Sequence, residues 1–203
     1  MSSIEEIAAV ARIMDLFPHP WFVSGGWAID LFLGEVTRHH EDREIGIFRE
    51  HQHALRAHLS GYDLFYAVSG PDGGEWITWQ GEWLDLPVHQ LLARPAGMGP
   101  PRGEWDRSHQ EFEFFLNEAE EGLWRCRRNP EITRPASEIS LRSPSGIPIL
   151  AAEIQLLYKA KWHRPKDEHD FQHALPHLDP SQRAWLRDAL PRCYEDDPWI
   201  LEL

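Results

Sequence analysis

The sequence predicts an α/β protein in which short strands alternate with helices and the last quarter of the chain is helical. Three observations support this class: helical spacing of apolar residues near the N-terminus, polar and apolar alternation in residues 42–48 and 111–116, and helical spacing again after residue 146. With 203 residues, 42% of them apolar, the chain can bury a core without disulfides or metal ions. A turn-forming Ser143-Pro144-Ser145-Gly146 separates a predicted α/β domain, residues 1–145, from a predicted helical C-terminal lobe, residues 146–203.

Local signals set the bounds of the elements in the first part of the chain. Apolar residues recur at helical spacing from Ile4 to Met14, and two prolines stop this helix near residue 17. The bulky residues 21–23 then form a short buried strand, and Ser24-Gly25-Gly26 forces a turn. A second helix follows over residues 27–33 and is closed by a glycine.

The middle of the chain alternates between strands and helices. Asp42 and Glu44 fall on one face of a strand over residues 42–48, whose other face is mainly apolar. A helix over residues 50–59 precedes a strand over residues 62–68. The remaining predicted segments are a loop over 69–74, two strands within 75–94, a surface connection over 96–103, and a pair of strands over 111–116 and 123–128.

Charge and composition exclude several function classes. The chain carries 33 acidic and 20 basic residues, and its net charge of −13 repels the phosphates of DNA and RNA and attracts cationic small molecules. It shows no signal peptide and no apolar run long enough to span a bilayer. Cys126 and Cys193 form no disulfide framework, which fits a reducing compartment. We therefore expect a cytoplasmic protein that acts on small molecules, with no DNA, RNA or membrane partner.

A glycine turn and a pair of carboxylates form the sharpest combination of motifs. Gly25 and Gly26 lie between a short strand and a helix, an arrangement whose backbone N–H groups suit an oligophosphate. Asp42 and Glu44 lie two residues apart on the next strand and face the same side, and paired carboxylates can hold Mg²⁺. Together these motifs predict a nucleoside triphosphate (NTP) site. The alternative is that the glycines only make a turn and the carboxylates only face water.

A longer pattern surrounds these motifs. It covers Ser24-Gly25-Gly26-Trp27-Ala28-Ile29-Asp30, then Gly34, then residues 37–44. This pattern resembles the signature of the DNA polymerase β-like nucleotidyltransferases, specifically the small antibiotic nucleotidyltransferases that act on aminoglycosides and lincosamides. Residues 157–161 and 164–171 look like the helical segment that such proteins place over the nucleotide. The resemblance implies the nucleotidyltransferase fold, a mixed sheet flanked by helices with a helical C-terminal lobe.

The resemblance also implies an activity and a metal site. The expected reaction transfers a nucleoside monophosphate from an NTP to a hydroxyl of a small acceptor, such as an aminoglycoside-type antibiotic, and so implies a role in antibiotic resistance. Asp42 and Glu44 would ligate Mg²⁺, with two ions bound alongside the NTP, because two metals stabilise both ends of an in-line displacement. A third carboxylate comes from a later strand in this family. We choose Glu113 as metal ligand and catalytic base, with Glu111 second and Asp85 third.

The nucleotide-binding residues follow from the same resemblance. Ser24 and Gly25 would cradle the β- and γ-phosphates, and Lys159 or Lys161 would neutralise the triphosphate and the departing pyrophosphate. The alternative for both lysines is an exposed helix face.

The second carboxylate departs from the family pattern. Relatives usually carry Asp-x-Asp, whereas this chain has Glu44 at the second position, and the extra methylene moves the oxygens by about 1 Å in a site where Mg²⁺ geometry is strict. This departure favours an alternative, a non-catalytic member of the fold that binds a nucleotide or a partner. A third hypothesis, a relative that nucleotidylates RNA, conflicts with the charge of −13.

A compact basic cluster follows the predicted strand that begins at residue 123. It consists of Arg125, Arg127 and Arg128, of which the first and second share a face of an extended chain. Two interpretations stay open for this cluster: a small anion-binding patch, or arginines paired with surface carboxylates.

Overall fold

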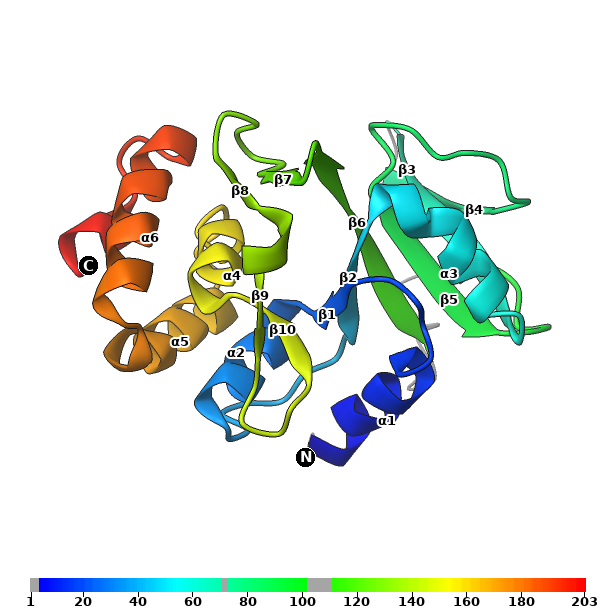
Figure 1. The fold of residues 1–203 in the computed structure, drawn as a ribbon, viewed down its shortest axis with the longest axis horizontal. Coiled ribbons are helices and arrows are strands. Elements are labelled where there is room, and N and C mark those ends of the chain that lie inside the picture. Colours follow the sequence, from blue (N-terminus) through cyan, green and yellow to red (C-terminus); the bar gives the residue numbers. More distant parts are fainter. Residues whose placement is uncertain (1–3, 71–72, 102–110) are drawn as a thin grey trace.

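The computed structural model describes residues 4–70, 73–101 and 111–203 (Figure 1). The helices are α1 Ile4–Met14, α2 Gly25–Leu33, α3 Gln52–His58, α4 Ala152–Lys159, α5 Pro165–Ala174 and α6 Pro180–Cys193. The strands are β1 Trp21–Val23, β2 Glu44–Phe48, β3 Tyr62–Gly70, β4 Gly73–Thr78, β5 Gln90–Pro95, β6 Phe112–Glu120, β7 Leu123–Arg125, β8 Thr133–Pro135, β9 Ser140–Arg142 and β10 Pro148–Leu150. The predicted α/β class is confirmed.

Within the described ranges, ten strands form one mixed sheet. The main order is β4-β3-β5-β6-β2-β1-β10-β9, and β7 and β8 extend it from the far end of β6. At the centre, β2 runs antiparallel to β1 and parallel to β6, in a register that sets Glu44 opposite Glu113. Paired residues of neighbouring strands face the same side of a sheet, so the register brings these two carboxylates together.

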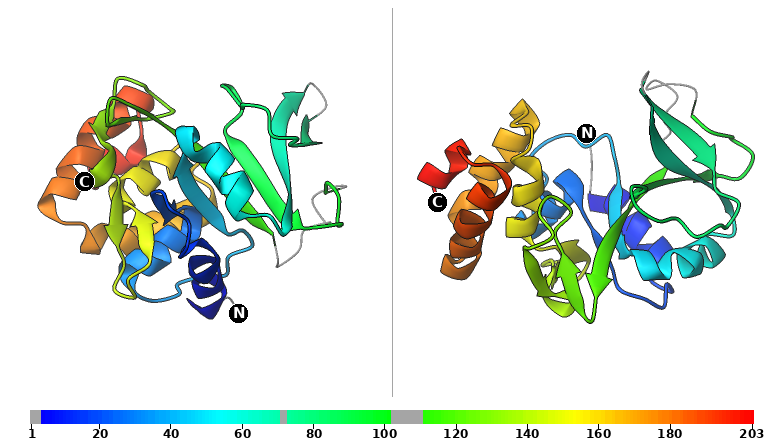
Figure 2. Two further views of the ribbon diagram at one scale, coloured as in Figure 1. Left: turned by 45° about the vertical axis from the view of Figure 1, so that its right-hand side comes forward. Right: turned by 90° about the horizontal axis from the view of Figure 1, so that it is seen from above.

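Two clusters of buried apolar side chains lie on opposite faces of the central strands. Val23 of β1 belongs to the first cluster, with Ile7 of α1 and Leu55 of α3. Its neighbour Phe22 belongs to the second, with Leu157 of α4. Successive strand residues point to opposite faces, so β1 contributes to both clusters. Figure 2 shows the C-terminal helices α4 to α6 on the side of the molecule away from β3 and β4.

Four predicted elements differ from the structure, and one of them, the strand predicted over residues 123–128, already ends at Arg125. Helix α2 begins at Gly25, so the glycine pair forms the first helical turn instead of preceding it, and Ser24 is its N-cap. Strand β2 begins at Glu44, so Asp42 lies just before the strand. The predicted loop over residues 69–74 is mostly part of a hairpin, because β3 reaches Gly70 and β4 starts at Gly73; residues 71–72 lie outside the described ranges.

The chain returns to the sheet after residue 145. Strand β10 pairs in parallel with β1 and antiparallel with β9, and the helical part of the chain begins only at Ala152. The division between domains at residue 145 stays a prediction. None of the helices in the described ranges is long and apolar enough to cross a membrane.

Candidate active site

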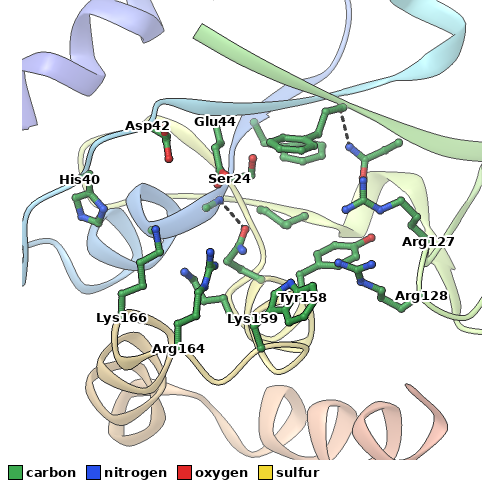
Figure 3. A pocket seen from close by; sticks show the side chains of 18 of the residues that line it. Ser24, His40, Asp42, Glu44, Arg127, Arg128, Tyr158, Lys159, Arg164 and Lys166 are labelled. Atoms are coloured by element: carbon green, nitrogen blue, oxygen red, sulfur yellow. Dashed lines mark hydrogen bonds between the residues drawn. The ribbon is translucent and has the colours of Figure 1, made fainter. Parts of the chain in front are cut away.

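A cavity lies between the central strands and the C-terminal helices (Figure 3). Its walls come from the end of β1, the first turn of α2, residues 38–44, the middle of β6, residues 125–128, α4 and the start of α5. Among the described residues that line it, seven are arginine or lysine and four are aspartate or glutamate. The cavity is therefore more basic than the chain as a whole, whose net charge is −13.

The structure brings the three predicted metal-binding carboxylates to one wall. Asp42 and Glu44 line the cavity, and Glu113 lies beside Glu44 on β6, where it accepts a hydrogen bond of 3.0 Å from Nε2 of Gln90. Burial, the charge of Glu113 and the charge of Asp42 raise the pKa of Glu44 to about 7, although Lys159 opposes the shift. The charge of Lys159 therefore does not compensate the burial of Glu44 and its repulsion by the other two carboxylates.

These carboxylates are not gathered into a formed metal site. Within the described part of the chain, no three histidine, cysteine, aspartate or glutamate side chains are arranged to hold an ion together. Their chemistry nevertheless suits Mg²⁺, which prefers carboxylate oxygens and keeps positions free for phosphates. A divalent cation would also remove the repulsion that raises the pKa of Glu44. The donor set fits the metal, and small side-chain rotations would have to complete the site.

The two reserve candidates for the third carboxylate lie elsewhere. Glu111 forms an ion pair with Arg94, with 2.7 Å between Oε1 and Nε, and both side chains are buried. Asp85 follows β4 in an irregular connection and accepts a hydrogen bond of 2.8 Å from Nε1 of Trp83. None of the three candidates belongs to the cavity lining. Of the three candidates, Glu113 is the one that β6 sets beside Glu44.

The backbone conformation and the close packing at Gly25 both require glycine. Its φ of +68° favours glycine, and a Cβ at this position would collide with the carboxylate of Glu44. Its backbone N–H donates to Oε1 of Gln155 on α4, at 2.7 Å (Figure 3). The first turn of α2 therefore packs directly against the predicted metal-binding wall, and a side-chain oxygen already occupies a place suited to a phosphate oxygen.

Ser24 offers a hydroxyl to the cavity. Its Oγ is buried, makes no side-chain cap bond to α2, and has no hydrogen-bond partner among the described residues. A buried hydroxyl without a partner costs about 1 to 3 kcal/mol. A ligand oxygen in the cavity would satisfy this group.

A network of charges forms the opposite wall. Nζ of Lys159 lies 2.6 Å from Oδ2 of Asp170 and 3.5 Å from Oδ1 of Asp167. Arg38 donates two hydrogen bonds of 2.7 Å to Asp170, and Arg164 donates one of 2.7 Å to Asp167. Burial opposes ionisation of Asp170, but the hydrogen bond from Arg38 and the charge of Lys159 lower the pKa of this carboxyl. Both aspartates thus stay charged and hold the cations at the cavity.

The two predicted lysines occupy different environments. Lys159 is buried and lines the cavity, whereas Lys161 is exposed and does not belong to the lining. Nζ of Lys161 lies 4.2 Å from the ring centroid of Trp162, which does line the cavity. Helix α4 ends at Lys159, so helical spacing does not carry over to Lys161.

Other residues of the long motif have structural roles. Asp30 accepts hydrogen bonds from the backbone N–H and the hydroxyl of Thr37, and its Oδ2 lies 2.5 Å from Nε2 of His40. The ring of His40 packs on Trp27, with 4.4 Å between centroids. These contacts fix the loop that leads to Asp42.

Sequence reasoning missed Arg38 and Gln155 as residues of the site. Arg38 belongs to the long motif, but its partner Asp170 lies 132 positions away. Gln155 lies among the apolar residues of α4, and its contact with Gly25 spans 130 positions. No local signal identifies either contact.

Comparisons with known proteins show what the chain as a whole is similar to. Over residues 6–68 the chain matches the model of a family described as aminoglycoside-2''-adenylyltransferase. A 2''-aminoglycoside nucleotidyltransferase of Klebsiella pneumoniae is 31% identical over 107 residues, which cover 50% of this chain and 59% of the relative. A 2''-aminoglycoside nucleotidyltransferase of Escherichia coli matches with the same identity and coverage. The match thus spans about three fifths of the length of these relatives.

Two solved structures extend the similarity to most of the chain. The lincosamide antibiotic adenylyltransferase LnuA, solved with lincomycin bound, has a TM-score of 0.57 and 15% identity, covering 87% of this chain and 98% of LnuA. The antibiotic-resistance factor ANT(2'')-Ia, solved in solution, has a TM-score of 0.54 and 17% identity, covering 95% and 91%. This chain has the nucleotidyltransferase fold. Its resemblance to the aminoglycoside and lincosamide nucleotidyltransferases, predicted from residues 24–44, is confirmed.

In this nucleotidyltransferase fold, Gly25→Ala should disturb the carboxylate wall, our name for Asp42, Glu44 and the neighbouring Glu113. The new methyl group would collide with the Glu44 carboxylate, and the backbone would keep a strained positive φ. We expect a loss of about 1 kcal/mol or more in stability, together with weaker binding of Mg²⁺ and nucleotide, measured by urea unfolding and calorimetry. Gly97→Ala is the control for strain alone, because Gly97 also has a positive φ but open space around it. Equal effects of both variants on nucleotide binding would contradict the role of Gly25.

The raised pKa of Glu44 should make the metal-free protein less stable as pH rises. The folded chain holds a proton on Glu44 up to about pH 7, whereas the unfolded chain releases it near the ordinary value of 4.5. The stabilisation is therefore present below pH 4.5 and is lost as pH rises through this window. Urea unfolding in EDTA at pH 5 and pH 8 measures the loss, and Glu44→Gln should reduce the difference. An unchanged pH dependence in this variant would refute the assignment.

Proposed function

We propose that this chain transfers a nucleoside monophosphate from an NTP to a hydroxyl of a small molecule, with the help of Mg²⁺. The observation that carries the proposal is the arrangement of charge across one cavity. Asp42 and Glu44 line one wall, with Glu113 paired beside Glu44 on β6, and arginine and lysine side chains line the opposite wall. Figure 3 shows Asp42 and Glu44 facing Arg164 and Lys166.

The basic wall and the glycine turn are suited to the triphosphate. Lys159 and Arg164 line the cavity, as do Lys166 and Ser24. The Ser24 hydroxyl would donate to a phosphate oxygen, and the Gly25 N–H would do so once the Gln155 side chain moves aside. Lys161 as a further phosphate contact stays a prediction.

The carboxylates would hold Mg²⁺ and accept a proton. Asp42, Glu44 and Glu113 offer oxygen ligands, and bound Mg²⁺ would neutralise phosphate charge and assist ionisation of the attacking hydroxyl. In the transfer, the acceptor oxygen loses its proton to Glu113 and forms a bond to the α-phosphorus. The bond between that phosphorus and the oxygen that bridges it to the β-phosphate breaks. Lys159 and Arg164 neutralise the charge of the departing pyrophosphate.

The relatives suggest the first acceptors to test. Two matched proteins are 2''-aminoglycoside nucleotidyltransferases, and a solved structure of ANT(2'')-Ia contains adenylyl-2''-tobramycin. We therefore propose an antibiotic-like hydroxylated acceptor, with the aminoglycosides as the first class to assay. The test incubates the full chain with each NTP, Mg²⁺ and a panel of aminoglycosides and lincosamides, and follows pyrophosphate release.

A second candidate function is nucleotide or partner binding without catalysis. Two observations favour it: the described carboxylates are not gathered into a metal site, and the pKa of Glu44 near 7 leaves it partly protonated at neutral pH. Nucleotide binding without pyrophosphate release for any acceptor would select this function over the transferase.

NTP binding should require a divalent metal under either function. Without a cation, Asp42, Glu44 and Glu113 repel one another and would repel the phosphates. We expect calorimetry to show saturable NTP binding with Mg²⁺ and at least tenfold weaker binding in EDTA, a difference of about 1.4 kcal/mol or more. Equal affinity in both buffers would remove the carboxylate wall from the nucleotide site.

A further inference from the structure

Two arginines stand at the side of the cavity formed by residues 125–128. Arg127 and Arg128 both line the cavity and lie two and three residues after the end of β7. In Figure 3 they lie next to Tyr158 and on the other side of the cavity from His40 and Asp42. We call Arg127 and Arg128 the arginine pair.

The nearby carboxylates belong to other arginines. Glu118 lies 2.7 Å from Nη2 of Arg49 and also accepts from its Nε, and Glu120 lies 2.7 Å from Nη2 of Arg125. No ion pair joins either member of the arginine pair to a carboxylate of the described ranges. Of the two sequence interpretations of this cluster, surface pairing holds for Arg125, and anion binding stays open for the other two arginines.

Aromatic rings position the first arginine of the pair. The Arg127 guanidinium lies 5.9 Å from the ring centroid of Phe115 and 5.7 Å from that of Tyr158. Cation–π contacts of this kind hold a guanidinium in place while leaving its N–H groups free to donate. Burial, together with the charge of Arg128, lowers the pKa of Arg127, so an anion at this point would relieve an unfavourable environment.

The second arginine carries an unsatisfied donor. Nε of Arg128 is buried and has no hydrogen-bond partner within the described ranges. Two adjacent guanidinium groups, one with a buried donor to satisfy, match the oxygens of a carboxylate or phosphate, which arginine binds through paired hydrogen bonds.

We propose that the arginine pair is an acceptor subsite for an anionic group, so that the acceptor is a small hydroxylated molecule that carries a carboxylate or a phosphate. This inference rests on the proposed transferase function. The triphosphate is assigned to Ser24, Lys159 and Arg164, which leaves the arginine pair for the second substrate. Hydroxylated carboxylates and phosphates therefore join the aminoglycosides and lincosamides in the acceptor panel, and the anionic compounds should be the better acceptors.

The test separates the acceptor subsite from the nucleotide site. The full chain is saturated with Mg²⁺ and an ATP analogue whose α–β bridge cannot be cleaved, and then titrated with inorganic phosphate and, separately, with acetate. We expect saturable binding of at least one of the two anions, and the better-bound anion identifies the group. Arg127→Gln and Arg128→Gln should each weaken this binding about tenfold and leave the affinity for the ATP analogue unchanged.

Two further variants test whether a loss of anion binding comes from the arginine pair itself or from a general change in charge or stability. Arg125→Gln, next to the pair but neutralised by Glu120, should leave anion binding within about twofold of the parent. Arg127→Lys keeps the charge but loses the paired donors, so it should bind phosphate more weakly than the parent even if its melting temperature is unchanged.

Two results would overturn the proposal directly: no saturable binding of either anion, or anion binding that neither glutamine variant weakens. A third is loss of affinity for the ATP analogue in those variants, which would assign the arginine pair to the NTP instead of the acceptor. Failure of the parent to bind the ATP analogue with Mg²⁺ would instead reject the proposed function. The anion titration of the nucleotide-free chain would then decide the subsite: weaker anion binding in Arg127→Gln with unchanged binding in Ser24→Ala supports the arginine pair, and the reverse pattern overturns it.

Discussion

Glu113→Gln should slow nucleotidyl transfer by about 10²- to 10⁴-fold, the range for loss of a general base, and leave the fold intact. Glu113 lies beside Glu44 on neighbouring strands, where it adds to the repulsion that raises the pKa of Glu44. Glutamine keeps the shape and the contact with Gln90 while removing that repulsion. We therefore expect a melting temperature equal to or above that of the parent, measured beside the rate of pyrophosphate release.

Asp85→Asn is the matched control for this variant. Asp85 is the third candidate, and it lies in the connection between β4 and β5, outside the strands that carry Glu44 and Glu113. Its replacement should change the rate less than about twofold, as expected for a surface carboxylate away from the site. A large rate loss for Asp85→Asn with little for Glu113→Gln would reverse the assignment. A variant of Glu113 that transfers at the parental rate would exclude it as base and metal ligand.

Glu111→Gln should instead reduce stability, by about 3 kcal/mol, because it breaks a buried ion pair. Arg94, whose Nε lies 2.7 Å from Oε1 of Glu111, is 1% exposed. Urea unfolding measures the loss, and the part of the protein that stays folded should keep its specific activity. Glu113 of β6 and Glu111, which directly precedes this strand, thus separate an effect on the rate from an effect on stability.

The double variant Glu111→Leu with Arg94→Met tests the cause of that loss. Replacing both partners of the ion pair by apolar side chains removes both buried charges, so much of the stability should return. A double variant as unstable as Glu111→Gln would show that packing at these positions, and not the broken ion pair, sets the cost. An unchanged stability in Glu111→Gln would show that the pair contributes nothing.

The sequence predicts the three carboxylates by two different routes. Asp42 and Glu44 are two residues apart in the chain, although only Glu44 belongs to β2, whereas Glu113 follows from the family resemblance and is set beside Glu44 by the parallel register of β2 and β6. The helices and most strands follow from apolar spacing. The start of α2 was misplaced because two glycines after a strand are compatible both with a turn and with a first helical turn.

The basic side of the cavity could not be predicted from local patterns. Its members come from segments far apart in the chain, and only packing of the C-terminal helices on the sheet decides which cations reach the cavity. Lys159 and Lys161 are two positions apart, yet the end of α4 sends one inward and the other to the surface. The arginine pair was visible as a cluster, but its surroundings, Phe115 and Tyr158, depend on the tertiary fold.

The double hydrogen bond between Arg38 and Asp170 has a consequence for how the chain unfolds. It joins the segment before β2 to α5, and Asp170 is fully buried. Detaching the C-terminal helices would break the ion pair of Arg38 and Asp170 and would also expose Phe22 of β1 to solvent. The free energy of such partial opening is therefore close to that of global unfolding, and heat or denaturant should melt both apolar clusters in a single cooperative transition.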